Sequence, residues 1–388
     1  MTKSSAVLSS LIAAGLGTFA CGGYSAGTAA SPAAPEFSYW VYVANESSDL
    51  VSVVRFGPDG IVEEDVIPVG IMPADLDGAH GMTVSPSGDY WYVSLAHGTP
   101  YGKVWKFSTG DDELIDSTTV GLFPATMAPT PDGSMLFTVN FNLHGNPVPS
   151  SVSAIFTPSM QEITRIETCI KPHGGRVNNR GSRHYSVCVA SDQLVEISTS
   201  QLAVSRRLYL TEGHERLLDK NDTGETLGPT SETNRRCKPT WVTVTPDDSQ
   251  LYVACNGRGE IIEIDAETLE IVRRFETGRG PYNLDVSRDG RFLVASLKGN
   301  QAIAVFDLPS GAETRIPSSQ PITHGVTITP DSRYAFISNE SIGATLGTVD
   351  VVDLETRELV ASVPVRHQPG GISFWKMEEY QPMENASR

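Results

Sequence analysis

His324-Gly325-Val326-Thr327-Ile328-Thr329-Pro330 is one copy of a phrase that recurs about seven times along the chain. Clear copies also begin at His80 and His173, and weaker copies begin at Ala125, Thr240, Tyr282 and Gly370. Each copy is followed by a turn of the Pro-Asp-Gly kind and then by a strand rich in aromatic and β-branched residues. A period of about 40–48 residues that carries four short strands is typical of β-propeller blades.

The two ends of the chain predict how the ring of blades closes. Three N-terminal strands lack an inner strand: Trp40–Ala44, Val51–Arg55 and Val62–Val69. Gly371–Trp375, near the C-terminus, is an inner strand without partners. Joined, these segments complete a seventh blade and leave no free sheet edge between the first and last blades. We therefore predict an all-β, seven-bladed propeller over residues 36–376, followed by a C-terminal tail at 377–388.

The N-terminus predicts export. A short apolar stretch, Ala6–Ala20, has the length of the apolar region of an export signal rather than of a membrane span. Cys21 follows directly and resembles the acylated cysteine of a bacterial lipoprotein, whereas cleavage after Ala30 would release a soluble protein. We expect a signal peptide at 1–20, a flexible tether at 21–35, and a periplasmic or cell-envelope location.

The charge of the chain limits its partners. The formal net charge is −17, and the basic residues do not cluster as phosphate contacts require, so a nucleic-acid partner is excluded. We expect a monomer that contacts a membrane only through a lipid on Cys21. Its partner would be a protein or a small-molecule ligand.

Four cysteines remain beyond Cys21, and they fall at matching positions of two blades. Cys188 and Cys255 share one position after the turn, and Cys169 and Cys237 precede the inner strands of the same blades. In an exported protein this pattern favours disulfides Cys169–Cys188 and Cys237–Cys255. A thiolate metal site is the alternative, and no Cys-x-x-Cys-His motif for covalent c-type haem exists.

One interruption breaks the repeat. Residues 211–236 form a polar insertion where other blades need only a few residues. Long loops without secondary structure are usually functional lids or disordered segments, so we expect such a loop here.

The histidines share a position in the fold. In a propeller blade the loop that leads into the inner strand lies on the same face as the loop between the second and third strands. All histidines except His184 fall in these places: His80, His97, His144, His173, His214, His324 and His367. Glu46 and Glu340, at the ends of second strands, join the same face.

This placement suggests a metal site. Neutral imidazole is a common transition-metal ligand, and we assign His80, His173, His324, His97 and His144 as candidate metal ligands, with copper as the expected metal. The placement resembles the copper site on the propeller of nitrous oxide reductase and the propellers that bind haem d1, although the consecutive His-His element is missing. The alternative is structural, with each His-Gly fixing a turn.

Short motifs add a family resemblance. Tyr42-Val43-Ala44-Asn45, Tyr252-Val253-Ala254-Cys255-Asn256 and Phe336-Ile337-Ser338-Asn339 resemble the repeat of the YVTN family of lactonase-like and YncE-like bacterial β-propellers. The resemblance spans the mature chain. It implies the propeller fold but leaves function open, because the family includes surface proteins, lactonase-like proteins and lipoproteins.

Three functions are compatible with these features. We favour an exported binding module that takes a ligand or partner on its loop-rich, histidine-rich face, without catalytic residues. The alternatives are a copper- or haem-d1-binding periplasmic protein and a lactonase-type hydrolase. The hydrolase would use His80, His324, Glu340 and Arg279 at the mouth of the ring.

Overall fold

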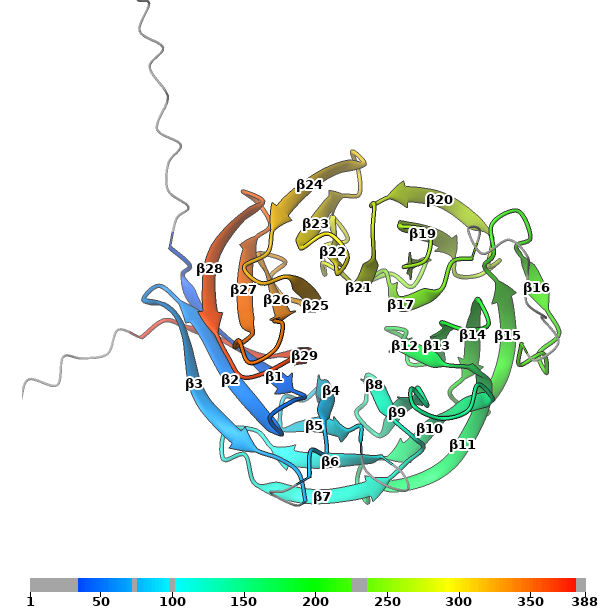
Figure 1. The fold of residues 1–388 in the computed structure, drawn as a ribbon, viewed down its shortest axis with the longest axis horizontal. Helices are drawn as coiled ribbons and strands as arrows, with labels where there is room; N and C mark the ends of the chain where they lie inside the picture. The colour runs from blue at the N-terminus through cyan, green and yellow to red at the C-terminus, as the bar shows by residue number, and fades with distance from the viewer. Residues whose placement is uncertain (1–33, 72–74, 98–101, 225–235, 382–388) are drawn as a thin grey trace, which may run out of the picture. The chain divides into compact units, whose positions relative to one another are not determined.

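The computed structural model describes residues 34–71, 75–97, 102–224 and 236–381. These residues form seven antiparallel sheets arranged as the blades of a ring (Figure 1). The fold is therefore the predicted all-β, seven-bladed propeller. The described residues contain no helix that is long and apolar enough to cross a membrane. The predicted signal peptide, Cys21 and most of the predicted tether lie outside the described residues.

Each blade runs from an inner strand at the central channel to an outer strand at the rim (Figure 1). Blade one is β29 (Pro369–Glu379), β1 (Phe37–Asn45), β2 (Leu50–Gly57) and β3 (Gly60–Pro68). Blade two is β4 (Ala79–Val84), β5 (Tyr90–Leu95), β6 (Lys103–Ser108) and β7 (Leu114–Thr119). Blade three is β8 (Pro124–Pro129), β9 (Met135–Asn140), β10 (Pro149–Phe156) and β11 (Gln161–Ile170).

The remaining blades follow in chain order. Blade four is β12 (Pro172–Val177), β13 (Arg183–Cys188), β14 (Gln193–Ser198), β15 (Ala203–Tyr209) and β16 (Arg216–Leu218). Blade five is β17 (Pro239–Val244), β18 (Gln250–Cys255), β19 (Glu260–Asp265) and β20 (Ile271–Glu276). Blade six is β21 (Pro281–Val286), β22 (Phe292–Leu297), β23 (Ala302–Asp307) and β24 (Ala312–Pro317). Blade seven is β25 (Ile322–Ile328), β26 (Tyr334–Glu340), β27 (Thr348–Asp353) and β28 (Glu358–Pro364).

The closing blade joins the two ends of the described chain. Strand β29 pairs antiparallel with β1, with Val41 opposite Phe374, so the inner strand of blade one comes from the C-terminal side. The strand is longer than the predicted Gly371–Trp375 and continues to Glu379, into the segment expected to be a tail. This extension is possible because β1 begins at Phe37 and offers backbone partners as far as Glu379.

The hydrophobic core lies between the blades. Both faces of the central strands are covered by neighbouring blades, so β5 and β18 are buried along almost their whole length. At the interface of blades one and two, Trp91 stacks on Phe107 of its own blade, with ring centroids 4.0 Å apart, and on Tyr42 of blade one at 5.2 Å. Such aromatic contacts fix the angle between successive blades.

The two predicted disulfides are confirmed. Cys169 is bonded to Cys188 and Cys237 to Cys255, with sequence separations of 19 and 18 residues. Cys237 directly precedes the inner strand of its own blade, whereas Cys169 lies in β11, so the bond to Cys188 joins the outer strand of blade three to the second strand of blade four. Disulfides form and persist in oxidising compartments, which is consistent with export.

The insertion at 211–236 contains secondary structure, so the expectation of a loop without its own structure was wrong. Residues 216–218 form β16, which pairs with β15 as a fifth strand of blade four. The outer edge of β15 offers free backbone groups, and the insertion is long enough to turn back and use them. Residues 225–235 of the insertion lie outside the described residues.

Candidate functional site

Each inner strand carries a β-bulge near its start, where the recurring phrase begins. In β25 the register shifts between Thr323 and Val326, so His324 occupies the irregular position. His80 and His173 occupy the same position of β4 and β12. A bulge leaves one residue unpaired and turns its side chain away from the regular alternation. The bulge recurs in blades that carry no histidine, so it belongs to the fold rather than to one site.

The glycine after each histidine is required by close backbone contact. A Cβ on Gly325 would lie 2.5 Å from the carbonyl oxygen of Gly370, and one on Gly81 would lie 2.7 Å from that of Ala125. Neighbouring inner strands can approach this closely only where no side chain intervenes. The glycine of each His-Gly pair is therefore structural, which agrees with the hypothesis that the pair fixes a turn. The close contact at the glycine does not decide the role of the neighbouring imidazole.

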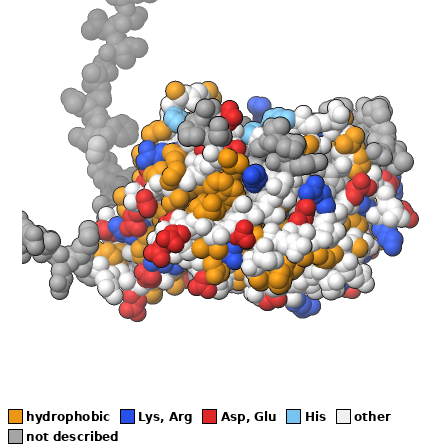
Figure 2. Space-filling model, turned by 90° about the horizontal axis from the view of Figure 1, so that it is seen from below, with side chains coloured by type: hydrophobic (Ala, Val, Ile, Leu, Met, Phe, Trp, Pro, Cys, Tyr) orange, Lys and Arg blue, Asp and Glu red, His pale blue; other side chains and the backbone are white. Residues whose placement is uncertain are grey.

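The three inner histidines meet at one mouth of the channel. The ring centroid of His80 lies 6.0 Å from that of His324 and 6.5 Å from that of His173. All three side chains are buried. Seen from the side of the ring, the visible histidine side chains lie along one face (Figure 2). The predicted convergence of these residues on one face is thus present in the structure, although this alone does not assign them a ligand.

Both ring nitrogens of His173 are in use. Its Nδ1 lies 2.8 Å from the carbonyl oxygen of Thr240, and its Nε2 lies 3.0 Å from the hydroxyl of Tyr282. Because a carbonyl oxygen only accepts, Nδ1 carries the proton and Nε2 accepts from the tyrosine. Burial lowers the pKa of His173 to about 3, so this neutral tautomer persists at physiological pH.

Glu46 connects His80, at the mouth of the channel, to His97 in the loop that follows β5. One carboxylate oxygen lies 2.7 Å from His80 Nδ1, and the other lies 2.8 Å from His97 Nε2. Burial alone would raise the pKa of Glu46, but the two imidazoles lower it well below its usual range. The hydrogen bond to Glu46 raises the pKa of His97. His97 in turn stacks on His144, with centroids 5.5 Å apart.

Lys298 and Glu340 form a second charged pair at the same mouth. Their Nζ and Oε1 atoms are 2.8 Å apart, and His324 Nε2 lies 3.5 Å from the same oxygen. Burial, followed by the charge of Lys298, lowers the pKa of His324. His324 Nδ1 is buried and has no hydrogen-bond partner among the described residues. The use of Glu340 and His324 in a lactonase-type hydrolase stays a prediction.

The structure thus divides the predicted metal ligands into two groups. His80, His173 and His324 surround the channel, whereas His97 and His144 lie in the loops that follow the second strands β5 and β9. Within the described ranges, no group of three or more histidine, cysteine, aspartate or glutamate side chains has the geometry of a metal site. The copper site therefore stays a prediction.

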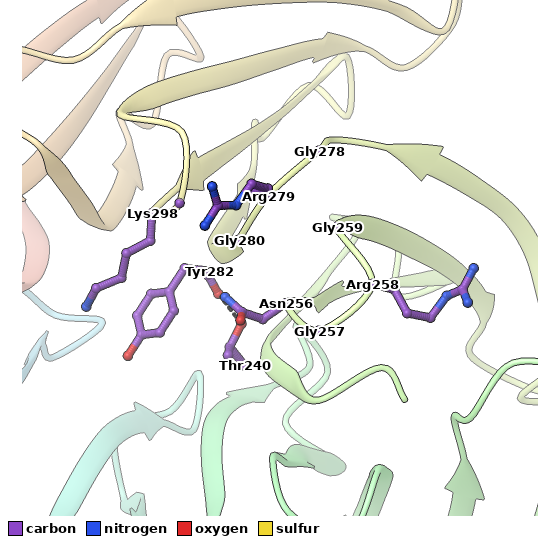
Figure 3. Close-up of a pocket in the computed structure, with 11 residues that line it drawn as sticks. Thr240, Asn256, Gly257, Arg258, Gly259, Gly278, Arg279, Gly280, Tyr282 and Lys298 are labelled. Carbon is purple, nitrogen blue, oxygen red and sulfur yellow. Dashed lines mark hydrogen bonds between the residues drawn. The ribbon is translucent and has the colours of Figure 1, made fainter. Parts of the chain in front are cut away.

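An open groove of about 690 Å³ lies on the histidine-rich face, between blades five and six (Figure 3). Three cationic side chains line it: Arg258, Arg279 and Lys298. Lys298 and Tyr282 connect the groove to the mouth of the channel. Backbone turns form much of its wall, contributed by Gly257, Gly259, Gly278, Gly280 and Gly299.

The three cations of the groove differ in their partners. Arg258 is neutralised by Glu212 of the insertion and by Glu260. Lys298 is paired with Glu340. Arg279 is exposed and has no ion-pair partner among the described residues. In Figure 3 the Arg258 side chain points away from Arg279 and Lys298.

Sequence reasoning missed two residues of this site. Tyr282 begins a copy of the repeated phrase at the position that holds histidine in other blades, and this match is the signal that could have identified it. Lys298 directly follows β22, in the loop of blade six that corresponds to the loop holding His97 after β5. Tyr282 contacts His173 of blade four and His324 of blade seven only because the closed ring gathers the starts of the inner strands around one mouth.

Comparisons with known proteins support the fold. A chain of Kuenenia stuttgartiensis hydrazine synthase is similar with a TM-score of 0.62 and 17% identity, over 78% of this chain and 93% of that chain. A functionally unknown protein from Desulfotomaculum acetoxidans is similar with a TM-score of 0.62 and 16% identity, over 87% of this chain and 98% of that chain. No protein-family model and no curated protein sequence matches the chain. At such identities the likeness concerns the fold alone.

The fold and site together define a seven-bladed β-propeller with two disulfides and a polar, histidine-rich face. On that face an open cationic groove adjoins the mouth of the channel.

Proposed function

We propose that the protein is an exported β-propeller of the YVTN-repeat type that binds a small anionic ligand on its histidine-rich face. The ligand would carry carboxylate or phosphate groups and would lie in the groove between blades five and six. The observation that carries this proposal is Arg279, which is exposed in the groove without an acidic partner among the described residues. The whole chain has a net charge of −17, so an unpaired cation gives this groove a local charge of the opposite sign, which attracts anions.

The size of the groove supports a small ligand. Its volume of about 690 Å³ falls within the range of about 300–1,000 Å³ that is common for small-molecule sites. Guanidinium groups bind carboxylates and phosphates in a two-pronged geometry. Lys298 supplies a second positive charge near the same wall, and Tyr282 supplies an aromatic surface beside it.

Calorimetric titration with citrate and with inorganic phosphate tests this proposal at low ionic strength. We expect at least one of these anions to bind, and Arg279→Gln to weaken its binding by about tenfold or more, because a hydrogen bond to a charged group is worth about 1.5–3 kcal/mol. Arg165→Gln is the matched control, because Arg165 pairs with Glu162 on an outer strand. No binding of either anion at millimolar concentration would overturn the proposal, as would equal affinity of both variants.

Copper binding is a second candidate, favoured by the state of the inner histidines. Burial lowers the pKa of His324, so its ring is neutral at pH 7, the form that binds metals, whereas both nitrogens of His173 already have partners. His324 Nδ1 has no protein partner among the described residues. Protein purified without a histidine tag would then hold stoichiometric copper. His80→Ala and His324→Ala should each remove this copper, and unchanged copper in both variants would exclude the cluster.

A further inference from the structure

Four Asn-x-Ser/Thr tripeptides occur in the sequence, and their surroundings in the fold separate them. They begin at Asn45, Asn221, Asn339 and Asn385. This tripeptide is the acceptor of N-linked glycans in exported proteins, provided that the asparagine is accessible on a surface loop. The two disulfides of this chain are consistent with export. Because so short a motif also recurs by chance, exposure decides which copy can be modified.

Two of the four asparagines are core residues. Asn45 has no exposed surface, and its amide donates to Ser52 Oγ at 2.9 Å. Asn339 is equally buried, and its amide donates to Thr348 Oγ1 at 3.2 Å. Both side chains are therefore part of the packing of their blades. Asn385 lies outside the described residues.

Asn221 lies in a turn of the insertion, shortly after β16. The Asp222 N–H donates to the Asp219 carbonyl oxygen at 3.0 Å, and the Asn221 N–H donates to Asp219 Oδ1 at 2.9 Å. Asn221 is exposed, and its side-chain amide has no hydrogen-bond partner in the described part of the chain. The amide nitrogen is thus accessible from solvent.

The backbone on both sides of Asn221 is held by blade four. Nε of the buried Arg207 donates to the Lys220 carbonyl oxygen at 2.7 Å, and Gln193 Nε2 donates to the Asp222 carbonyl oxygen at 3.2 Å. These bonds leave the exposed Asn221 side chain at the tip of the turn. Strand β16 forms the outer edge of blade four (Figure 1), so a large substituent on this turn can extend into solvent.

Asp219 is a second signal at the same turn. Bacterial enzymes that transfer glycans to asparagine also recognise an acidic residue two positions before it. Asp219 occupies this position before Asn221 and is exposed. The corresponding residues of the other three tripeptides are apolar: Val43, Ile337 and Met383. Asn221 is thus the asparagine at which the acid, the hydroxyl residue and exposure coincide.

We infer that Asn221 is the attachment site of an N-linked glycan, transferred by a bacterial oligosaccharyltransferase. The inference rests on the export in the proposed function but not on ligand binding. The co-substrate would be an oligosaccharide linked to a lipid diphosphate. The Asn221 amide nitrogen bonds to C1 of the first sugar and loses one proton, while the bond from C1 to the diphosphate oxygen breaks. The lipid diphosphate leaves with the electron pair of that bond.

Expression of the full chain in a bacterial host that carries such a transferase and its lipid-linked oligosaccharide tests the inference. Mass spectrometry of the exported protein should show the added mass of one glycan, located on the peptide that contains Asn221. A host with an inactive transferase should give no added mass. Asn221→Gln should abolish the modification, whereas Asn385→Gln, the matched control, should keep it.

Two further positions separate recognition of the motif from the shape of the turn. Asp219→Asn keeps an oxygen that can accept from the Asn221 N–H and removes only the charge, so it should lower the glycan occupancy about tenfold or more. Thr223→Ser keeps the hydroxyl group and should keep the glycan, whereas Thr223→Val should abolish it.

The possible failures are distinguishable. Exported protein that has lost its signal peptide and carries no glycan would overturn this inference alone. A glycan found only on Asn45, Asn339 or Asn385 would also overturn it. Retention of the signal peptide on all chains would show that the export in the proposed function is wrong, and this inference would fail with it.

Discussion

His184 is the one histidine that the sequence places away from the others, and its surroundings are apolar. The side chain is buried, stacks on Phe137 with centroids 5.3 Å apart, and has no hydrogen-bond partner for either nitrogen among the described residues. Burial, assisted by the charge of Arg176, lowers its pKa from 6.5 to about 3. Between these pH values the unfolded chain binds a proton that the folded chain does not. Stability therefore decreases as pH falls from about 6.5 towards 3.

His184→Phe should flatten this pH dependence. The substitution preserves the stacked ring and removes the group that must stay neutral. We expect the free energy of unfolding to fall less steeply below pH 6.5, by up to about 1.4 kcal/mol per pH unit. Urea unfolding at pH 7 and pH 5 measures the change. The same slope in both proteins would show that His184 is not a source of acid sensitivity.

A second prediction at the scale of single residues concerns the space around Gly325. Gly325→Ala places a methyl group 2.5 Å from the Gly370 carbonyl oxygen and 2.7 Å from Ser338 Oγ. The hydroxyl of Ser338 joins the two blades by accepting from the Gly325 N–H and donating to the Gly370 oxygen. We expect a loss of about 1–3 kcal/mol in unfolding free energy, measured by urea denaturation.

Gly370→Ala is the matched control for this substitution. Its Cβ would meet only ordinary contacts, the nearest being 3.6 Å away at His324 Cε1. It should therefore change stability by less than about 0.5 kcal/mol. A similar loss in both variants would mean that general glycine flexibility, rather than the close approach of the strands, explains the effect.

At the scale of elements, the two disulfides form at corresponding positions of neighbouring blades. The enclosed loops are almost equal, at 19 and 18 residues. Loop-closure entropy then predicts a stabilisation of about 3 kcal/mol for each bond. We expect Cys237→Ala/Cys255→Ala and Cys169→Ala/Cys188→Ala to lose similar amounts in urea unfolding. Clearly unequal losses would show that local packing dominates over chain entropy.

Thiol titration of the denatured, unreduced protein checks the bonds directly. None of the four propeller cysteines should react, whereas prior reduction should expose all four. Two or more reactive thiols without reduction would contradict the pairing. It would also return the thiolate metal site to consideration.

The insertion shows where reasoning about elements from the sequence failed. Its polar composition predicts a loop, yet Arg216–Leu218 adds a strand to blade four. Ion pairs of Glu212 with Arg258 and of Glu215 with Arg274 fasten it to blade five. A strand of this length has too few residues for a periodic pattern. It forms because a neighbouring strand edge and two arginines are already in place.

At the scale of the whole molecule, stability depends on closing the ring. Strand β29 contributes the inner strand of blade one and packs against β4 and β25 of the adjacent blades. Without it, Tyr42 and Val43 of β1 would lose their inner neighbours. A chain that ends at Gln368 should therefore lose cooperative thermal unfolding and should aggregate, as circular dichroism and size-exclusion chromatography would show. A chain that ends at Gln381 retains all of β29 and should unfold like the full chain.

The propeller itself could be predicted because its information is local and repeated. The turn and strand pattern around Pro131-Asp132-Gly133 recurs once per blade despite the insertion at 211–236, so the number of blades and the closure follow from counting. The cysteine pairs follow in the same way, because Cys188 and Cys255 occupy matching positions in consecutive blades. The face that carries most histidines also follows, since alternating strand directions fix which loops lie together.

The contacts between side chains were decided only by the tertiary structure. The sequence shows that His80 and Glu46 share a face, but not that Glu46 joins His80 to His97. It gives no sign that Arg176 and Trp241 line one cavity. These contacts join residues of different blades, and their distances depend on the bulge of each inner strand and the packing angle between sheets. A repeat fixes the position of each residue within its own blade, whereas closing the ring determines which residues of other blades it meets.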